Sequence, residues 1–161
     1  MSAQREQAWI WEVRPLLTVA LPSEPTAPRR AREALEDLPP YLNEQLAKLR
    51  LIVTELVTNS VRHAGLSPAD QIEITILERG EQIRVEVRDP GAGYEATSEM
   101  LHHLPSERTP DQPLPEGGFG LLVVASLADR VGARWDGGTV VWTELGGTAR
   151  DTESGASGPK Y

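Results

Sequence analysis

The sequence predicts an α+β fold: a two-layer sandwich in which a mostly antiparallel sheet carries helices on one face. Three features predict it. Helical patterns fill much of the first half, two later pairs of strand-like segments are each joined by a glycine-containing turn, and one more helical pattern separates the pairs. The 161 residues suit one domain of ordinary size. We expect an extension over residues 1–13, the domain over 14–145 and a disordered tail over 146–161.

The N-terminal part of the domain is expected to form a strand and then a helix. The strand has one buried face, made by the alternating residues Leu17, Val19 and Leu21. Thr26 is placed to cap a helix over 27–38, with Pro28 in its first turn and Pro39-Pro40 at its end. We interpret the arginines of this helix as a solvated face. They are Arg29, Arg30 and Arg32.

A second helix is expected over 43–64, ended by Gly65. Strands over 71–78 and 82–89 follow, joined by a turn at 79–81. Residues 94–116 contain four prolines and little periodicity, so we expect an unstructured stretch that serves as a lid. A third helix, to about residue 129, and strands over 131–136 and 139–145 complete the domain.

Composition excludes several classes of function. The net charge of −8 argues against unaided binding to nucleic acid or to an anionic membrane, because phosphate groups favour positive charge. The chain contains no cysteine, which excludes disulfides, thiolate metal sites and cysteine nucleophiles. The longest strictly apolar run, residues 121–125, is too short for a transmembrane helix. The cytoplasm is therefore the expected compartment.

The second helix carries a carboxylate and an amide one turn apart. Its apolar face comprises Leu46, Leu49, Val53, Leu56, Val57 and Ala64. Glu55 and Asn59 lie roughly opposite that face, and their side chains are neighbours. Because Leu51 and Ile52 flank Glu55, we expect most sides of the helix to be covered, so that Glu55 and Asn59 face a partly enclosed space. An exposed polar stripe is the alternative interpretation.

A second candidate group stands at the end of the strand over 82–89. The alternation of this strand places Asp89 on the side of its apolar residues, toward the core. Gly91 and Gly93 follow, and their missing Cβ atoms permit close approach of the backbone. A carboxylate placed in this way can accept a hydrogen bond from a buried ligand, such as the exocyclic amine of adenine. A plain Asp-Pro-Gly turn that ends the strand is the alternative.

A glycine-rich segment opens the third helix. It reads Gly117-Gly118-Phe119-Gly120-Leu121. Free backbone N–H groups and the positive end of the helix dipole attract phosphate. The segment contains no lysine or arginine, so backbone donors and a divalent cation would have to neutralise the phosphate charge. It matches neither a P-loop nor a dinucleotide fingerprint, and glycine-rich turns before helices are common.

The order of the three motifs is more specific than any one of them. Glu-x-x-x-Asn on a helix, Asp-x-Gly-x-Gly after a strand and Gly-x-Gly-Leu at a helix start resemble the GHKL superfamily of histidine-kinase-like ATPases, with the Bergerat ATP-binding fold. The resemblance covers about residues 14–145. Residues 55–64, Glu-Leu-Val-Thr-Asn-Ser-Val-Arg-His-Ala, are most similar to the anti-sigma-factor serine/threonine kinases.

This resemblance implies a role for each motif. Glu55 would be the general base that takes the proton of an attacking serine or threonine hydroxyl, and Asn59 would hold Mg²⁺ against the phosphates of ATP. Asp89 would recognise adenine. The residues implied to bind the nucleotide are Asn59, Arg62, His63, Asp89, Gly91, Gly93, Gly117, Gly118, Phe119, Gly120, Leu121 and Thr139. Residues 94–116 would form the lid over it.

Many members of this superfamily carry a threonine near the adenine on the last strand. In this chain either Thr139 or Val140 takes that place, and a valine would remove one hydrogen bond to the base. The implied partners are a sigma factor and an anti-anti-sigma antagonist protein. A homodimer is also implied, for which Trp9, Trp11 and the first strand supply an apolar edge.

Three functional hypotheses follow. The first is an ATP-dependent protein serine/threonine kinase that regulates transcription by partner switching. The second is a catalytically silent, nucleotide-sensing adaptor of the same fold. The third is a detached histidine-kinase catalytic domain, for which His102 and His103 are interpreted as polar loop residues and a partner would supply the phosphoacceptor histidine.

Overall fold

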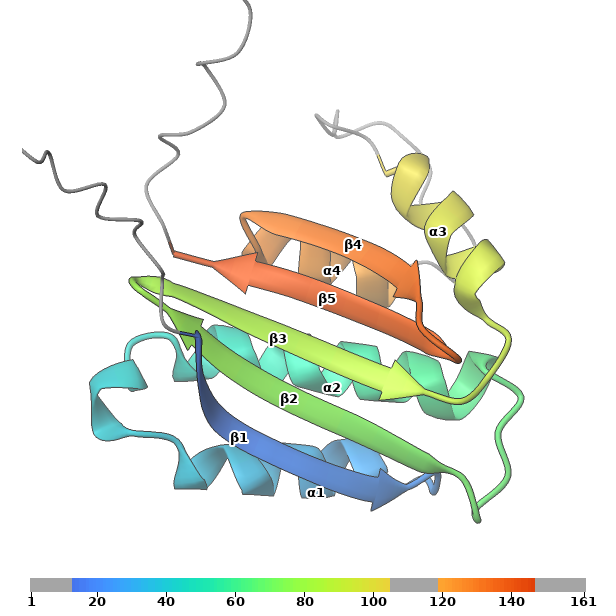
Figure 1. Ribbon diagram of the computed structural model, residues 1–161, viewed down its shortest axis with the longest axis horizontal. Helices are drawn as coiled ribbons and strands as arrows, with labels where there is room; N and C mark the ends of the chain where they lie inside the picture. Colours follow the sequence, from blue (N-terminus) through green and yellow to red (C-terminus); the bar gives the residue numbers. More distant parts are fainter. Residues whose placement is uncertain (1–12, 105–118, 147–161) are drawn as a thin grey trace, which may run out of the picture.

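Five strands form one antiparallel sheet in the order β1-β2-β3-β5-β4, and helices cover one of its faces (Figure 1). The computed structural model describes residues 13–104 and 119–146. The strands are β1 (Val13–Pro22), β2 (Gln71–Arg79), β3 (Gln82–Asp89), β4 (Arg130–Trp135) and β5 (Thr139–Leu145). The predicted α+β class and antiparallel sheet are confirmed.

Two tight turns build the sheet as hairpins. Gly80, with φ of 60°, joins β2 to β3, and Gly137, with φ of 66°, lies between β4 and β5. Both residues adopt the left-handed conformation that glycine enters without a steric cost. Pairing of β3 with β5 then brings the two hairpins together and sets Asp89 opposite Thr139. This register determines which side chains meet at that end of the sheet.

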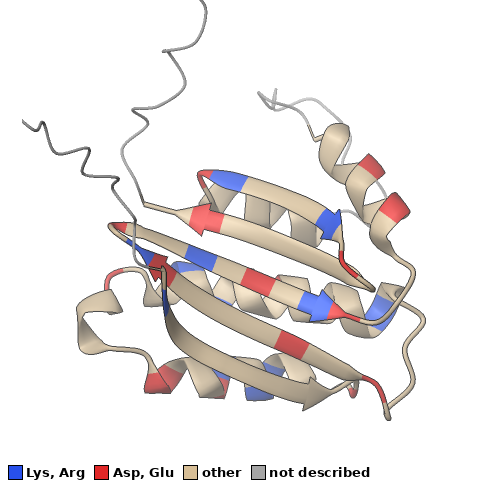
Figure 2. Ribbon diagram, in the orientation of Figure 1, with Lys and Arg blue, Asp and Glu red and all other residues tan. Residues whose placement is uncertain are grey.

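The other face of the sheet carries charged and aromatic side chains. Figure 2 marks the positions of the charged residues along the strands. Glu86 lies between Arg84 and Arg134, at 2.7 and 2.9 Å. Burial acts to raise the pKa of Glu86, but the hydrogen bonds from the two arginines outweigh it and hold that pKa below its ordinary value. The Arg84 guanidinium also lies 4.3 Å from the ring centre of Trp142. This face is therefore a network of paired charges.

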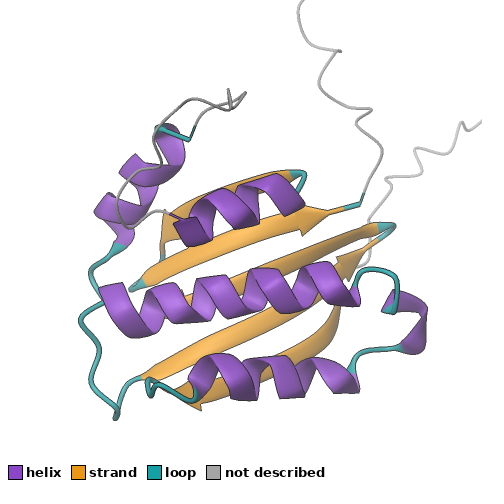
Figure 3. Cartoon of the chain, turned by 180° about the vertical axis from the view of Figure 1, so that it is seen from behind, coloured by secondary structure: helices purple, strands orange, loops and turns teal. Residues whose placement is uncertain are grey.

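The helical layer lies on the opposite face, with α2 between α1 and α4 (Figure 3). The α-helices are α1 (Ala27–Ala34), α2 (Leu46–His63), α3 (Tyr94–His102) and α4 (Phe119–Leu127), and the 3₁₀ turns are η1 (Leu35–Asp37) and η2 (Pro40–Leu42). The core is aliphatic. Its fully buried members include Leu49, Ile52, Val53, Leu56 and Val57 of α2, and Ile72, Ile74, Ile76, Val85 and Val87 of β2 and β3.

Four expectations about the helices were wrong in detail. Thr26 precedes α1 but makes no side-chain cap hydrogen bond, because its backbone is already helical. The helix over 27–38 changes to a 3₁₀ turn after Ala34, and the helix expected from residue 43 begins at Leu46. Leu51 was expected on a covered side of α2 but is 49% exposed, whereas its neighbour Ile52 is buried.

The expectation that residues 94–116 are unstructured was also wrong in its first third, whereas their role as a lid stays a prediction. Residues 94–102 form α3, with His102 in its last turn and His103 as its C-terminal cap residue. Each of these histidines places Nδ1 beside a backbone carbonyl oxygen four residues earlier, so they end a helix instead of lying in a loop. The prolines that suggested irregular structure start only at residue 105.

Some expectations lie outside the described residues. These are the apolar edge at Trp9 and Trp11, the remainder of the lid, the glycines Gly117 and Gly118, and the tail beyond residue 146. Among the described helices, none combines the length and the apolar character needed to cross a membrane.

Thr143 provides a test of the packing. Its side chain is fully buried on the inner face of β5, and its Oγ1 has no hydrogen-bond partner among the described residues. We expect Thr143→Val to raise the free energy of unfolding by about 1 kcal/mol, because it removes an unsatisfied hydroxyl at nearly constant volume. Urea denaturation measures the change. The matched control, Thr139→Val, removes a hydroxyl that does donate a hydrogen bond and is expected to lower stability. A loss of stability in Thr143→Val would contradict this assignment.

Candidate functional site

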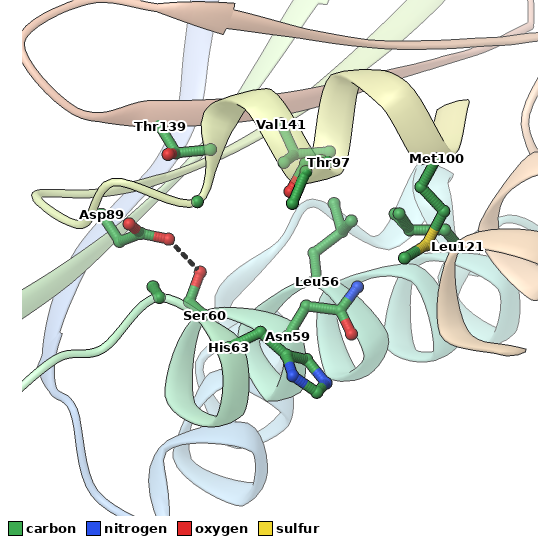
Figure 4. A pocket seen from close by; sticks show the side chains of 13 residues that line it. Leu56, Asn59, Ser60, His63, Asp89, Thr97, Met100, Leu121, Thr139 and Val141 are labelled. Atoms are coloured by element: carbon green, nitrogen blue, oxygen red, sulfur yellow. Dashed lines mark hydrogen bonds between the residues drawn. The ribbon is translucent and has the colours of Figure 1, made fainter. Parts of the chain in front are cut away.

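A cavity of about 300 Å³ opens where α2, α3, β3 and β5 meet (Figure 4). Its lining is mostly apolar, with a few polar groups that converge on it, as in small-molecule sites. The lining residues are Leu56, Asn59, Ser60, His63, Ala64, Asp89, Gly93, Ala96, Thr97, Met100, Leu121, Thr139 and Val141. Two of the predicted motifs, on α2 and at the end of β3, therefore contribute to one site.

Asp89 is the buried carboxylate of this cavity, with 4% of its surface exposed. Ser60 Oγ donates a hydrogen bond of 2.6 Å to Asp89 Oδ2, drawn as the dashed line in Figure 4. The backbone N–H of Gly91 donates to Asp89 Oδ1 at 2.9 Å. The predicted inward orientation of Asp89 is confirmed. Each carboxylate oxygen has a second lone pair, so the group can still accept a donor from a ligand.

Of Thr139 and Val140, the two residues left open, Thr139 faces the cavity. Thr139 pairs with Asp89 across β5 and β3, and successive residues of a strand point to opposite faces. Thr139 lines the cavity together with Val141, whereas Val140 lies on the other face. Thr139 Oγ1 donates to the carbonyl oxygen of Gly91 at 3.1 Å and keeps an acceptor lone pair.

The α2 residues divide between the cavity and its edge. Asn59 and His63 line the cavity, whereas Arg62 is exposed and takes no part in its lining. Glu55 lies at the edge, half-buried and against the first turn of α4. A Cβ on Gly120 would lie 2.7 Å from Glu55 Oε2 and 3.4 Å from Asn59 Oδ1. The start of α4 therefore meets both polar side chains at once.

The glycines after β3 have different physical roles. A Cβ on Gly91 would lie 2.4 Å from the carbonyl oxygen of Ala64, so this glycine lets the turn pack beneath the end of α2. A Cβ on Gly93 would lie 3.8 Å from the carbonyl oxygen of His63, an ordinary contact, and Gly93 lines the cavity. The close approach expected at Gly91 thus serves protein packing, and only Gly93 faces ligand space.

Seven lining residues were not among the predicted site residues: Leu56, Ser60, Ala64, Ala96, Thr97, Met100 and Val141. A signal for Ser60 was present, because it is a hydroxyl on the sheet-facing side of a helix whose other inward positions are aliphatic. Thr97 and Met100 were missed because α3 was expected to be unstructured. Leu121, which was predicted, lines the cavity from α4.

The roles of Gly91 and Gly93 can be distinguished by experiment. Gly91→Ala is expected to lower the free energy of unfolding by about 1–3 kcal/mol, because its Cβ collides with backbone that has nowhere to move. Gly93 has a φ of −74°, which alanine adopts without strain. Gly93→Ala is therefore expected to leave the free energy of unfolding nearly unchanged. Since its methyl group enters the cavity, it should instead lower the affinity for the adenine nucleotide that the sequence resemblance implies. Urea denaturation and calorimetry measure the two effects, and an equal loss of stability in both variants would contradict these roles.

The comparisons with known proteins agree on one family. Residues 21–144 match the histidine kinase-like ATPase domain. The chain is 28% identical over 130 residues to Serine-protein kinase RsbW of Listeria monocytogenes serotype 4a, covering 78% of this chain and 83% of that protein. It is 30% identical over 106 residues to Serine-protein kinase RsbW of Bacillus pumilus, covering 63% of this chain and 65% of that one. With its matched fold, its order of motifs and the cavity they surround, this chain belongs to the histidine kinase-like ATPase domain family.

Proposed function

We propose that this protein is an ATP-dependent serine/threonine protein kinase that acts as an anti-sigma regulatory factor. It would bind a sigma factor in one state and phosphorylate an anti-anti-sigma antagonist in another. One observation carries the proposal: the buried Asp89 lies in a ligand-sized cavity that Asn59 also lines and that has Glu55 at its edge. Similarity to proteins named serine-protein kinases supports the choice of a hydroxyl acceptor.

The cavity suits an adenine base. Asp89 is an acceptor held in place by Ser60 and Gly91, and an exocyclic amine is the donor it would bind. Leu56, Met100 and Val141 supply apolar surface on which a flat ring can pack. The volume, about 300 Å³, accommodates the base and sugar, with the phosphates directed toward Asn59 and the start of α4.

Magnesium fits the donor set in a limited way. Among the described residues, no three His, Cys, Asp or Glu side chains form a cluster that could hold a metal by themselves. Mg²⁺ typically needs only one or two protein ligands, because it keeps waters and substrate phosphates. The Asn59 side-chain oxygen would supply one such ligand. When bound, the ion would neutralise part of the phosphate charge.

The position of Glu55 at the edge suits a base that meets an external acceptor. Its carboxylate would take the proton of a serine or threonine hydroxyl on the partner protein. The hydroxyl oxygen forms a bond to the γ-phosphorus while the bond from that phosphorus to the bridging oxygen breaks, and ADP leaves with the electron pair. Asn59, one turn further along α2, lies next to this base and lines the cavity.

The silent adaptor remains the second candidate because one observation favours it. Glu55 does not line the cavity, and its carboxylate contacts the backbone region of Gly120 instead. A protein that only senses nucleotide would need Asp89 and Asn59 but no base. The two candidates differ in whether Glu55 affects phosphoryl transfer.

The role of Asp89 is tested by a nearly isosteric change. Asp89→Asn replaces a carboxylate oxygen with an amide nitrogen, which cannot accept the adenine amine. We expect ATP affinity, measured by calorimetry with Mg²⁺, to fall by at least about tenfold, a loss equivalent to one charge-assisted hydrogen bond. GTP, which lacks that amine, should bind weakly to both forms. Unchanged ATP affinity in the folded variant would exclude Asp89 from base recognition.

The role of Glu55 is tested by Glu55→Gln. We expect label transfer from γ-labelled ATP to an antagonist protein to fall by about 10²- to 10⁴-fold, the usual contribution of a general base, while ATP affinity changes little. Arg62→Gln is the matched control, because Arg62 is exposed on the same helix and outside the cavity lining. If the wild-type protein binds ATP and transfers no label, the adaptor replaces the kinase.

A further inference from the structure

Two large apolar side chains are exposed close to Glu55. Leu51 is 49% exposed and lies one turn before Glu55 on the same side of α2. Phe119 is 52% exposed and directly precedes Gly120, the residue whose Cβ position meets Glu55. Apolar surface therefore adjoins the proposed catalytic base from two different helices.

Packing within residues 13–104 and 119–146 does not account for these two side chains. The inward side of α2 packs its aliphatic residues on the sheet, while α1 and α4 lie along its flanks, as Figure 3 shows. At about 100° per residue, Leu51 falls near the centre of the remaining, outward side. Phe119 likewise stays outside the core, whereas Leu121 and Val124 of the same helix are buried. Exposed apolar groups beside a functional residue are typical of contact surfaces.

A groove lined by three arginines and two glutamates borders the outward side of α2. It has a volume of about 340 Å³ and is lined by Arg29, Arg32, Glu33, Glu36 and Arg50. Arg29 pairs with Glu33 at 3.0 Å. Arg32 donates only to the uncharged Thr54 Oγ1, at 3.2 Å. Within the described part of the chain, Arg32 and Arg50 have no carboxylate partner.

Guanidinium groups that pair with no carboxylate of the described residues are notable on a chain with a net charge of −8. A guanidinium binds a carboxylate in a two-pronged geometry that fixes orientation as well as affinity. The helical positions give an order across α2: Arg50 toward α1, then Leu51 on the outward side, then Glu55 toward α4. A cationic group, an apolar group and the base thus follow one another along a single path.

We propose that four side chains beside Glu55 form the docking surface for the protein substrate of the kinase. These are Arg32, Arg50, Leu51 and Phe119. The occupant is a protein segment that crosses α2 from the α1 side to the α4 side. It places a carboxylate in the groove at Arg32 and Arg50, an apolar side chain on Leu51 and Phe119, and a serine or threonine hydroxyl at Glu55. This inference rests on the proposed kinase function and adds the substrate class: an acidic residue and an apolar residue on the same side of the phosphoacceptor.

Binding and transfer are measured separately on the full chain with Mg²⁺ and ATP. The probe is a set of fluorescein-labelled peptides with a central serine, in which each flanking position is acidic, basic, apolar or polar in turn. Fluorescence anisotropy measures binding, and γ-labelled ATP measures transfer to the same peptides. We expect the wild-type protein to select one acidic and one apolar position on the same side of the serine.

The variants test each half of the surface. Leu51→Ser is expected to weaken binding of the selected peptide by about 5- to 10-fold and to abolish the apolar preference. Arg50→Glu is expected to reverse the acidic preference to a basic one. The matched controls are Val13→Ser, an exposed apolar residue of β1, and Arg79→Glu, an exposed arginine of β2. Neither control should change selection, and none of the four variants should change ATP affinity.

The outcomes distinguish this inference from the proposed function. If the wild-type protein shows no selection, or if Leu51→Ser and Arg50→Glu keep it, the docking surface is wrong even when label is transferred. If selection is present and the variants shift it while no label moves, the surface stands as a binding site and the kinase activity fails. Loss of selection in both controls would show that the variants act through general surface changes, which also overturns the proposal.

Discussion

The hydrogen bond from Ser60 Oγ to Asp89 Oδ2 is the interaction on which the site depends. It joins the helical layer to the end of β3 across the layer boundary, at a point where an unpaired buried carboxylate would be costly. The turn after β3 can complete the carboxylate's hydrogen bonding only because Gly91 fits beneath Ala64. One buried carboxyl group therefore fixes the end of α2, the turn and the end of β3 relative to one another.

The cavity exists because the packing chemistry changes along the interface between sheet and helices. Along most of α2, large aliphatic side chains fill the space against β2 and β3. Toward its C-terminal end the facing residues become Ser60, Asp89 and Thr139, which are small or polar and leave volume unfilled. A core packed to ordinary density would close this space. The sandwich thus keeps its stability in one part and its ligand space in another.

Sequence patterns predicted the fold class, the hairpins, the burial of Asp89 and the placing of Asn59, because each depends on local periodicity or on a turn residue. They could not settle Thr139 against Val140, since that choice follows from the pairing of β5 with β3, which lie far apart in the chain. They missed α3 because prolines further along were weighed against the whole stretch. Leu51 was assigned to a covered side because apolar character alone does not distinguish a core position from a contact surface.

The two sides of α2 divide the proposed chemistry. Leu56 and Ser60 face inward to the cavity, whereas Leu51 and Glu55 turn toward solvent and α4, and Asn59 lies between the two sets. Because one rigid helix carries all of them, a nucleotide held from inside and a protein segment held from outside would meet at a distance that the helix fixes. A general base inside the cavity would be inaccessible to a protein acceptor. A general base on the far outward side of α2 would be too distant from the phosphates of ATP. The half-buried position of Glu55, against the first turn of α4, satisfies both requirements.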